Sequence, residues 1–194
     1  MNKTVQTILK LLSATTMAQL MMIISSPFLT RIFEPEDMGA FQLFVSISAV
    51  LSTVASFQFE RGIMLPKRNK DALNLFVLCF ILITLSTTII FISALFIVDR
   101  NSDNYFIYTF LLPMAVFFMG IFRTLNFWGT RLSNYNHIAI STFSKSIVTI
   151  TLQLGIGTFL SSNNFVLIIG YLFGHIAAVL VLSLTVLLQK KLFE

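Results

Sequence analysis

Lys145 is the ionisable side chain that fits its surroundings least well, because it lies inside a long apolar segment. It follows His137 by eight residues, which is roughly 12 Å along a helix rising 1.5 Å per residue. A lysine near the centre of a membrane span costs roughly 2.5–3.5 kcal/mol, so its ammonium group should face water, a carboxylate or a bound anion. Thr149 and Gln153 continue the same helix face. The alternative is a side chain that snorkels to the membrane surface.

Two further groups of polar residues lie where apolar segments end. Glu60 and Arg61 close one segment, and we expect them to pair with each other or to face an internal cavity. A solvated pair at the membrane surface is the alternative. Arg123 lies about one turn before the end of another segment and is followed by Asn126. Arg123 can snorkel to the surface, but this is the most polar helix end in the chain.

His175 and Gln19 are weaker candidates. His175 lies near the middle of an apolar segment and could relay protons, because the pKa of an imidazole is near neutral. A neutral, hydrogen-bonded histidine is the alternative. Gln19 follows Ser13 and Thr16 at helical spacing, which gives one polar stripe on an apolar helix. The stripe would either line an aqueous cavity or hydrogen-bond to neighbouring helices.

Several chemistries are not indicated by the sequence. It has no paired carboxylates within a span, no metal-ligand spacing, no GxSxG or HExxH motif and no phosphate-binding glycine loop. We therefore predict no enzyme activity, no cofactor and no metal site. The net charge of +5 does not indicate nucleic acid, because the basic residues lie in short loops rather than in one patch with exposed aromatics.

The composition requires lipid as the solvent for this chain. Hydrophobic residues make up 56% and charged residues 11% of 194 residues, which is more apolar surface than a soluble fold can hide. A bilayer core of about 30 Å needs about 20 apolar residues of helix. Six segments meet this length: Val5–Leu29, Met38–Phe59, Ala72–Val98, Tyr105–Phe127, His137–Leu160 and Phe165–Leu188. We predict an all-α, multi-pass membrane protein in which residues 1–194 form one six-helix bundle.

The distribution of basic residues predicts the orientation. With the N-terminus inside, the cytoplasmic side holds ten of the 13 Lys and Arg residues, and the outer side holds Arg31 and Arg100. Both termini are therefore expected in the cytoplasm. A second six-helix bundle would enter the membrane in the same direction and could pair with this one about an axis along the membrane normal.

Local patterns predict how some helices end and pack. Pro27 is expected to terminate the first helix, and Pro113 is expected to bend the fourth. Gly170 and Gly174 have the small-xxx-small spacing that allows close helix contact. The small residues of the second segment are expected to pack against another helix without a chemical role; they are Ser46, Ala49, Ser52, Thr53 and Ser56.

Three stretches resemble a known family. They are SPFLTRIFEPEDMGAFQLF (Ser26–Phe44), FERGIMLPK (Phe59–Lys67) and NFWGTRLSNYNHIAIS (Asn126–Ser141). The first is similar to the arginine, Pro-Glu and glycine arrangement of the bacterial polysaccharide-biosynthesis flippases, carried here by Arg31, Pro35, Glu36 and Gly39. These are the O-antigen and capsule transporters of the multidrug/oligosaccharidyl-lipid/polysaccharide exporter superfamily.

The resemblance implies half of a flippase fold in the bacterial inner (plasma) membrane. The family has two six-helix bundles around a cavity that holds the headgroup of a polyprenyl-diphosphate-linked oligosaccharide. This sequence holds one bundle, so we expect a truncated or split product, or a half-unit that must pair with a second six-helix bundle. The polyprenyl tail would stay in the membrane lipid.

The resemblance also gives the candidate residues a shared role. Arginine donates two parallel hydrogen bonds to phosphate, whereas lysine acts as a point charge. The expected cavity cations are Arg31, Arg61, Arg123 and Lys145. Gln19, Asn126 and Gln153 would contact sugar hydroxyls, and Glu60 and His175 are candidates for ion coupling. The alternatives are efflux of drugs or small cations, which acidic residues within a span would favour, and a non-transporting assembly subunit.

Overall fold

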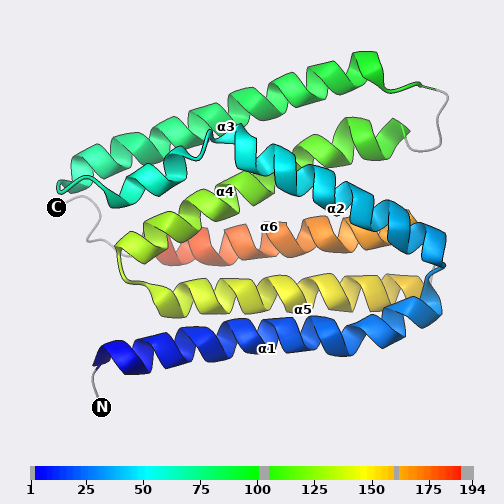
Figure 1. The fold of residues 1–194 in the computed structure, drawn as a ribbon, viewed down its shortest axis with the longest axis horizontal. Helices are drawn as coiled ribbons and strands as arrows, with labels where there is room; N and C mark the ends of the chain where they lie inside the picture. Colours follow the sequence, from blue (N-terminus) through cyan, green and yellow to red (C-terminus); the bar gives the residue numbers. More distant parts are fainter. Residues whose placement is uncertain (1–2, 101–104, 160–161, 189–194) are drawn as a thin grey trace. The chain divides into compact units, whose positions relative to one another are not determined.

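The protein is almost entirely helical. The computed structural model describes residues 3–100, 105–159 and 162–188, and it describes side chains in those ranges from residue 16 to residue 184. Helix makes up about 90% of the structure, and the described residues contain no strand. The elements in chain order are α1 (Lys3–Ile32), α2 (Pro35–Ala55), the 3-10 helix η1 (Phe59–Met64), α3 (Asn69–Ile97), the π-helix η2 (Ile107–Leu111), α4 (Leu112–Arg131), α5 (Tyr135–Phe159) and α6 (Asn164–Leu188) (Figure 1).

Five helices in the described part of the chain are long and apolar enough to cross a membrane. They are Pro35–Ala55, Asn69–Ile97, Ile107–Arg131, Tyr135–Phe159 and Asn164–Leu184. Large apolar side chains are exposed on them, for example Ile81, Leu85 and Phe96 of Asn69–Ile97, as expected for contact with lipid. The all-α, multi-pass class is therefore confirmed. A sixth span in α1 and the orientation of both termini stay predictions.

Several predicted helix ends were wrong. Pro27 lies inside α1 and does not end it, because a membrane helix can tolerate the single missing N–H donor. The second helix begins at Pro35 and ends at Ala55, rather than spanning Met38–Phe59. The fourth helix continues past Phe127 to Arg131. The predicted end of the fifth helix, Leu160, lies outside the described residues.

A π-helix precedes Pro113, where a bend was predicted, and the bend itself stays a prediction. Proline has no N–H, so the carbonyl group four residues earlier, on Thr109, loses its usual helical partner. The five-residue π-helix Ile107–Leu111 contains Thr109 and ends two residues before Pro113, the second residue of α4. A wider turn of this kind is a common response to an interrupted hydrogen-bond ladder.

The chain divides into two compact units. The first unit comprises Met1–Phe41 and Gly129–Glu194, and the second comprises Gln42–Trp128. In the first, α5 lies between α1 and α6 (Figure 1). Its described apolar core includes Phe33, Val166 and Leu167. The prediction that all six helices form one bundle stays a prediction.

Close approach of α5 and α6 depends on two glycines, as the spacing predicted. A Cβ atom added at Gly170 would lie 2.6 Å from Gln153 Cγ. A Cβ atom added at Gly174 would lie 2.9 Å from the Lys145 carbonyl oxygen. The start of α2 is also held in this unit, because Asp37 Oδ1 accepts a 2.9 Å hydrogen bond from the first N–H of α6, on Asn164.

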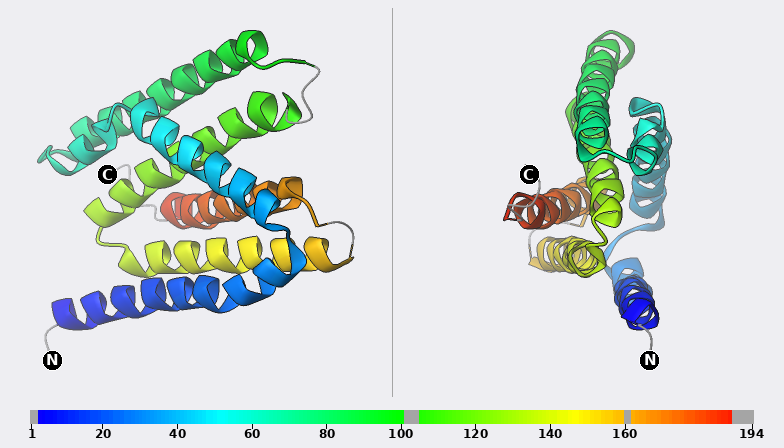
Figure 2. Two further views of the ribbon diagram at one scale, coloured as in Figure 1. Left: turned by 45° about the vertical axis from the view of Figure 1, so that its right-hand side comes forward. Right: turned by 90° about the vertical axis from the view of Figure 1, so that its left-hand side faces the viewer.

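The second unit is built on α3 and α4, which run antiparallel side by side (Figure 2). Phe76 contacts Trp128 at 5.4 Å, and Phe91 contacts Phe110 at 5.6 Å, measured between ring centroids. The end of α2 is tied to α3 by a hydrogen bond of 2.9 Å from Ser86 Oγ to the Ala55 carbonyl oxygen. These contacts position the end of α2 and the 3-10 helix η1, where the candidate site lies.

Candidate functional site

A break in helical backbone geometry after α2 shapes the site. Phe57 and Gln58 both have left-handed backbone angles, with φ values of 50° and 59°. For residues other than glycine this conformation costs roughly 1–2 kcal/mol each. The α-helix therefore stops, and η1 begins at Phe59 with a 3.0 Å hydrogen bond from its N–H to the Ser56 carbonyl oxygen. With this geometry the side chain of Glu60 contacts Ser56, directly after the end of α2.

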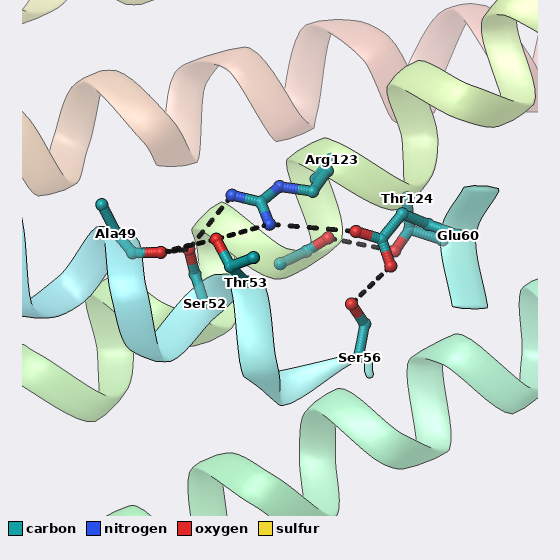
Figure 3. Close-up of polar contacts among 8 residues, drawn as sticks. Ala49, Ser52, Thr53, Ser56, Glu60, Arg123 and Thr124 are labelled. Carbon is teal, nitrogen blue, oxygen red and sulfur yellow. Dashed lines mark hydrogen bonds and ion pairs between the residues drawn. The ribbon is translucent and has the colours of Figure 1, made fainter. Parts of the chain in front are cut away.

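Glu60 is a buried carboxylate with partners on two sides. Only 1% of the residue is exposed. Its Oε2 atom accepts a hydrogen bond of 2.5 Å from Ser56 Oγ, and its Oε1 atom lies 3.8 Å from Arg123 Nη1 (Figure 3). A buried charge needs partners of this kind, because desolvation of an unpaired ion is very costly.

Arg123 reaches from α4 to the hydroxyl groups of α2. Its Nη1 donates to Thr53 Oγ1 at 3.0 Å and its Nη2 donates to Ser52 Oγ at 3.4 Å. Both hydroxyls donate their own protons to the Ala49 carbonyl oxygen, at 3.0 Å from Ser52 and 2.8 Å from Thr53. Their lone pairs are therefore available to the guanidinium group (Figure 3). This arrangement fixes the position of the cation with neutral acceptors.

A pocket of about 320 Å³ opens beside this pair. It is lined by Thr53, Gln58, Glu60, Arg61, Arg123 and Phe127. Two arginines and one carboxylate leave it with a net positive charge, and 31% of the Arg123 side chain is exposed. The volume is at the lower end of the range for small-ligand sites. No group of metal-ligating side chains occurs in the described residues. The pocket is suited to binding an anionic group.

Three predicted site residues meet in this pocket: Glu60, Arg61 and Arg123. Glu60 and Arg61 were expected to pair with each other or to face a cavity. Both line the pocket, and the ion pair of Glu60 is with Arg123. Asn126 belongs to the same unit but does not line the pocket. Its Nδ2 donates to the Phe122 carbonyl oxygen of its own helix at 2.7 Å.

The remaining predicted site residues belong to the first unit. Gln19 and Arg31 are exposed on α1, and Lys145 is half-buried on α5. Gln153 is buried, and its Nε2 donates to the Leu167 carbonyl oxygen of α6 at 2.8 Å. The prediction that these cations and amides share one cavity with Arg123 stays a prediction. The Ser13 side chain lies outside the described residues.

His175 is held by its own helix. It is 4% exposed, and its Nδ1 atom lies 3.0 Å from the Tyr171 carbonyl oxygen. Because a carbonyl oxygen only accepts, Nδ1 is the donor in this contact. The imidazole ring also packs edge-on against the Tyr171 ring at 4.5 Å between centroids. These contacts match the hydrogen-bonded alternative for this residue, and a role in ion coupling stays a prediction.

Sequence analysis missed the hydroxyl groups of the site. The expectation that Ser52, Thr53 and Ser56 only pack was wrong, because they bind the two charged groups. A signal was present: Ser52, Ser56 and Glu60 are spaced by four residues, as expected for one helix face.

Gln153 is expected to be important for stability and not for ligand binding. Gln153→Ala removes a buried hydrogen bond to Leu167 and should lower the free energy of unfolding by about 1–3 kcal/mol. Denaturation of the detergent-solubilised protein measures this loss. Thr151→Ala, at an exposed position of α5, is the matched control and should change little. A Gln153→Ala protein with unchanged stability would contradict this expectation.

Fold and site together define a helical multi-pass membrane protein with a cationic pocket near one helix end. In comparisons with protein-family models, curated proteins and solved structures, nothing matched the chain.

Proposed function

We propose that this protein takes part in moving a polyprenyl-diphosphate-linked oligosaccharide across the bacterial inner membrane. The observation that carries the proposal is Arg123, a cation fixed by hydroxyl groups at the wall of a pocket within an apolar helical unit. A fixed guanidinium group in such a place suits a phosphate group, because its planar set of donors matches phosphate oxygens.

The physical need for such a site is large. A sugar diphosphate headgroup is polar and anionic, so its passage through hydrocarbon without help is prohibitive. A wet pocket with fixed cations replaces part of the lost hydration. Arg61 supplies a second cation at the pocket wall. The volume of about 320 Å³ would take only part of a headgroup, with the polyprenyl tail left in lipid.

The proposal includes a second six-helix bundle, either a separate chain or another copy of this one. Two bundles that enter the membrane in the same direction can rock against each other and expose a cleft to each side in turn. One bundle alone provides one wall of such a cleft. The resemblance of Ser26–Phe44 to the flippase family supports this arrangement.

Deletion of the coding sequence in the source bacterium tests the proposal. We expect loss of surface polysaccharide, with lipid-linked repeat units accumulating on the cytoplasmic side. Complementation with Arg61→Gln should restore export only in part, to about a tenth of normal, because one pocket cation is missing. Arg68→Gln, an exposed position before α3, is the control and should restore export fully. Unchanged surface glycan in the deletion strain would reject the function.

Glu60 favours a second candidate, efflux of cationic compounds. It is a carboxylate that is 1% exposed and lines the same pocket, and acidic residues of this kind bind cations. The deletion strain separates the two candidates. Efflux predicts higher sensitivity to cationic compounds with normal surface glycan. The pocket carries two cations against one anion, so we give priority to the anionic substrate.

A further inference from the structure

The contact between Glu60 and Arg123 is looser than a direct hydrogen bond. The distance of 3.8 Å from Oε1 to Nη1 is too long for a direct hydrogen bond, and it is longer than the 3.0 Å and 3.4 Å contacts of the guanidinium group with Thr53 and Ser52. The guanidinium group is instead held by two neutral hydroxyls, on Thr53 and Ser52. Its hydrogen bonds are therefore made to α2 and not to the carboxylate. Glu60 provides a negative charge beside the cation without a direct hydrogen bond to it.

The other oxygen of Glu60 is anchored independently. Ser56 Oγ donates to Oε2, so a small shift of Oε1 away from Arg123 would leave the carboxylate with a hydrogen-bond donor. The Ser56 contact is made by a different carboxylate oxygen from the one that faces Arg123 (Figure 3). The pocket thus contains an anion of its own that keeps a hydrogen-bond donor when Oε1 moves away from the cation.

We propose that Glu60 is a built-in competitor for the anion site of Arg123, a tethered carboxylate that a diphosphate group displaces on binding. This inference rests on the proposed function. In this role Glu60 sets the affinity of the site for anions. A positioning role, in which Glu60 would orient Arg123, is a different role. A tethered competitor lowers the apparent affinity for every anion by the same mass-action factor. Weak monovalent anions are then kept out, and the diphosphate is released more readily after transport.

The proposal predicts whether one substitution strengthens or weakens anion binding. Glu60→Gln keeps the shape and the contact with Ser56 but removes the charge. We expect it to bind inorganic pyrophosphate about tenfold more tightly than the unchanged protein, because the opposing carboxylate at 3.8 Å is gone. Chloride should inhibit pyrophosphate binding to Glu60→Gln and should have little effect on the unchanged protein.

Calorimetric titration of the full chain in lipid nanodiscs measures both effects. Asp71→Asn removes the same charge at an exposed position of α3 that does not line the pocket, and it should behave as the unchanged protein. Glu60→Asp draws the carboxylate back by one methylene, so its gain in pyrophosphate affinity should be smaller than that of Glu60→Gln. It also provides the test if Glu60→Gln does not fold.

The outcomes separate this inference from the proposed function. Tighter binding to Glu60→Gln supports the competitor role. Equal or weaker binding overturns it, and weaker binding would identify Glu60 as a positioning residue for Arg123. If pyrophosphate binds the unchanged protein through Arg123 but Glu60→Gln is no tighter, only this inference fails. If pyrophosphate binds no variant, the anion site and the proposed function fail with it.

Discussion

Replacing Arg123 with glutamine is expected to abolish pyrophosphate binding and glycan export and also to destabilise the fold. The substitution leaves Glu60 buried without its cation. Breaking a buried ion pair from one side costs about 3–5 kcal/mol, and we expect a value near the lower end because 31% of the Arg123 side chain is exposed. Chemical denaturation in detergent measures the loss of stability, and calorimetric titration measures the loss of binding.

A double variant separates the two effects. Glu60→Gln combined with Arg123→Gln removes both charges, so stability should largely return while pyrophosphate binding stays absent. Arg123→Lys keeps the charge but cannot hold Ser52 and Thr53 with two separate nitrogens, so it should bind weakly. Normal export by a folded Arg123→Gln protein would contradict the proposed role of this residue.

Charge and hydropathy were enough to identify the two ions of this site but not their contact. Glu60 and Arg123 were both singled out because ionisable groups are rare in apolar segments. Their proximity depends on the break between α2 and η1 at Phe57 and Gln58, where two residues other than glycine adopt left-handed angles. Neither residue type signals such a turn, since glycine and asparagine are the usual choices. A contact between residues 60 and 123 could therefore not be predicted.

The helices themselves were predictable because long apolar segments have few alternatives in lipid. The ends of the helices were less predictable. The expectation that a proline ends the helix was wrong at Pro27, where α1 continues to Ile32. At Pro113 the helix widens into a π-helix before the proline. Hydropathy does not report which carbonyl groups lose their partners, and these local hydrogen bonds decide where a helix stops or widens.

Lys145 and Gln153 show a different limit of the sequence argument. Spacing correctly placed both on α5, but it could not distinguish a face that lines a cavity from a face that packs against α6. Gln153 is buried in the contact with α6, as its hydrogen bond to Leu167 shows. The glycine spacing on α6 carried the relevant information, because only a close neighbour makes glycine necessary at Gly170 and Gly174.

Gly174→Ala is accordingly expected to destabilise the first unit strongly. The added methyl group would collide with Thr149 Oγ1 and approach the Lys145 carbonyl oxygen to 2.9 Å. A side chain can rotate away, but a backbone oxygen cannot, so α5 and α6 must separate. We expect the free energy of unfolding to fall by about 2–3 kcal/mol, as for overpacked cores. Thermal unfolding in detergent provides the measurement.

Two further variants test whether the close contact between α5 and α6 causes the loss of stability. Gly155→Ala on α5 adds the same methyl group where nothing lies within 4 Å, and it should be neutral or stabilising by up to about 1 kcal/mol because alanine favours the helix. Thr149→Ala combined with Gly174→Ala should recover only part of the loss, because the Lys145 carbonyl oxygen remains. If Gly174→Ala is as stable as Gly155→Ala, then α5 and α6 do not approach as closely in the membrane as the structure places them.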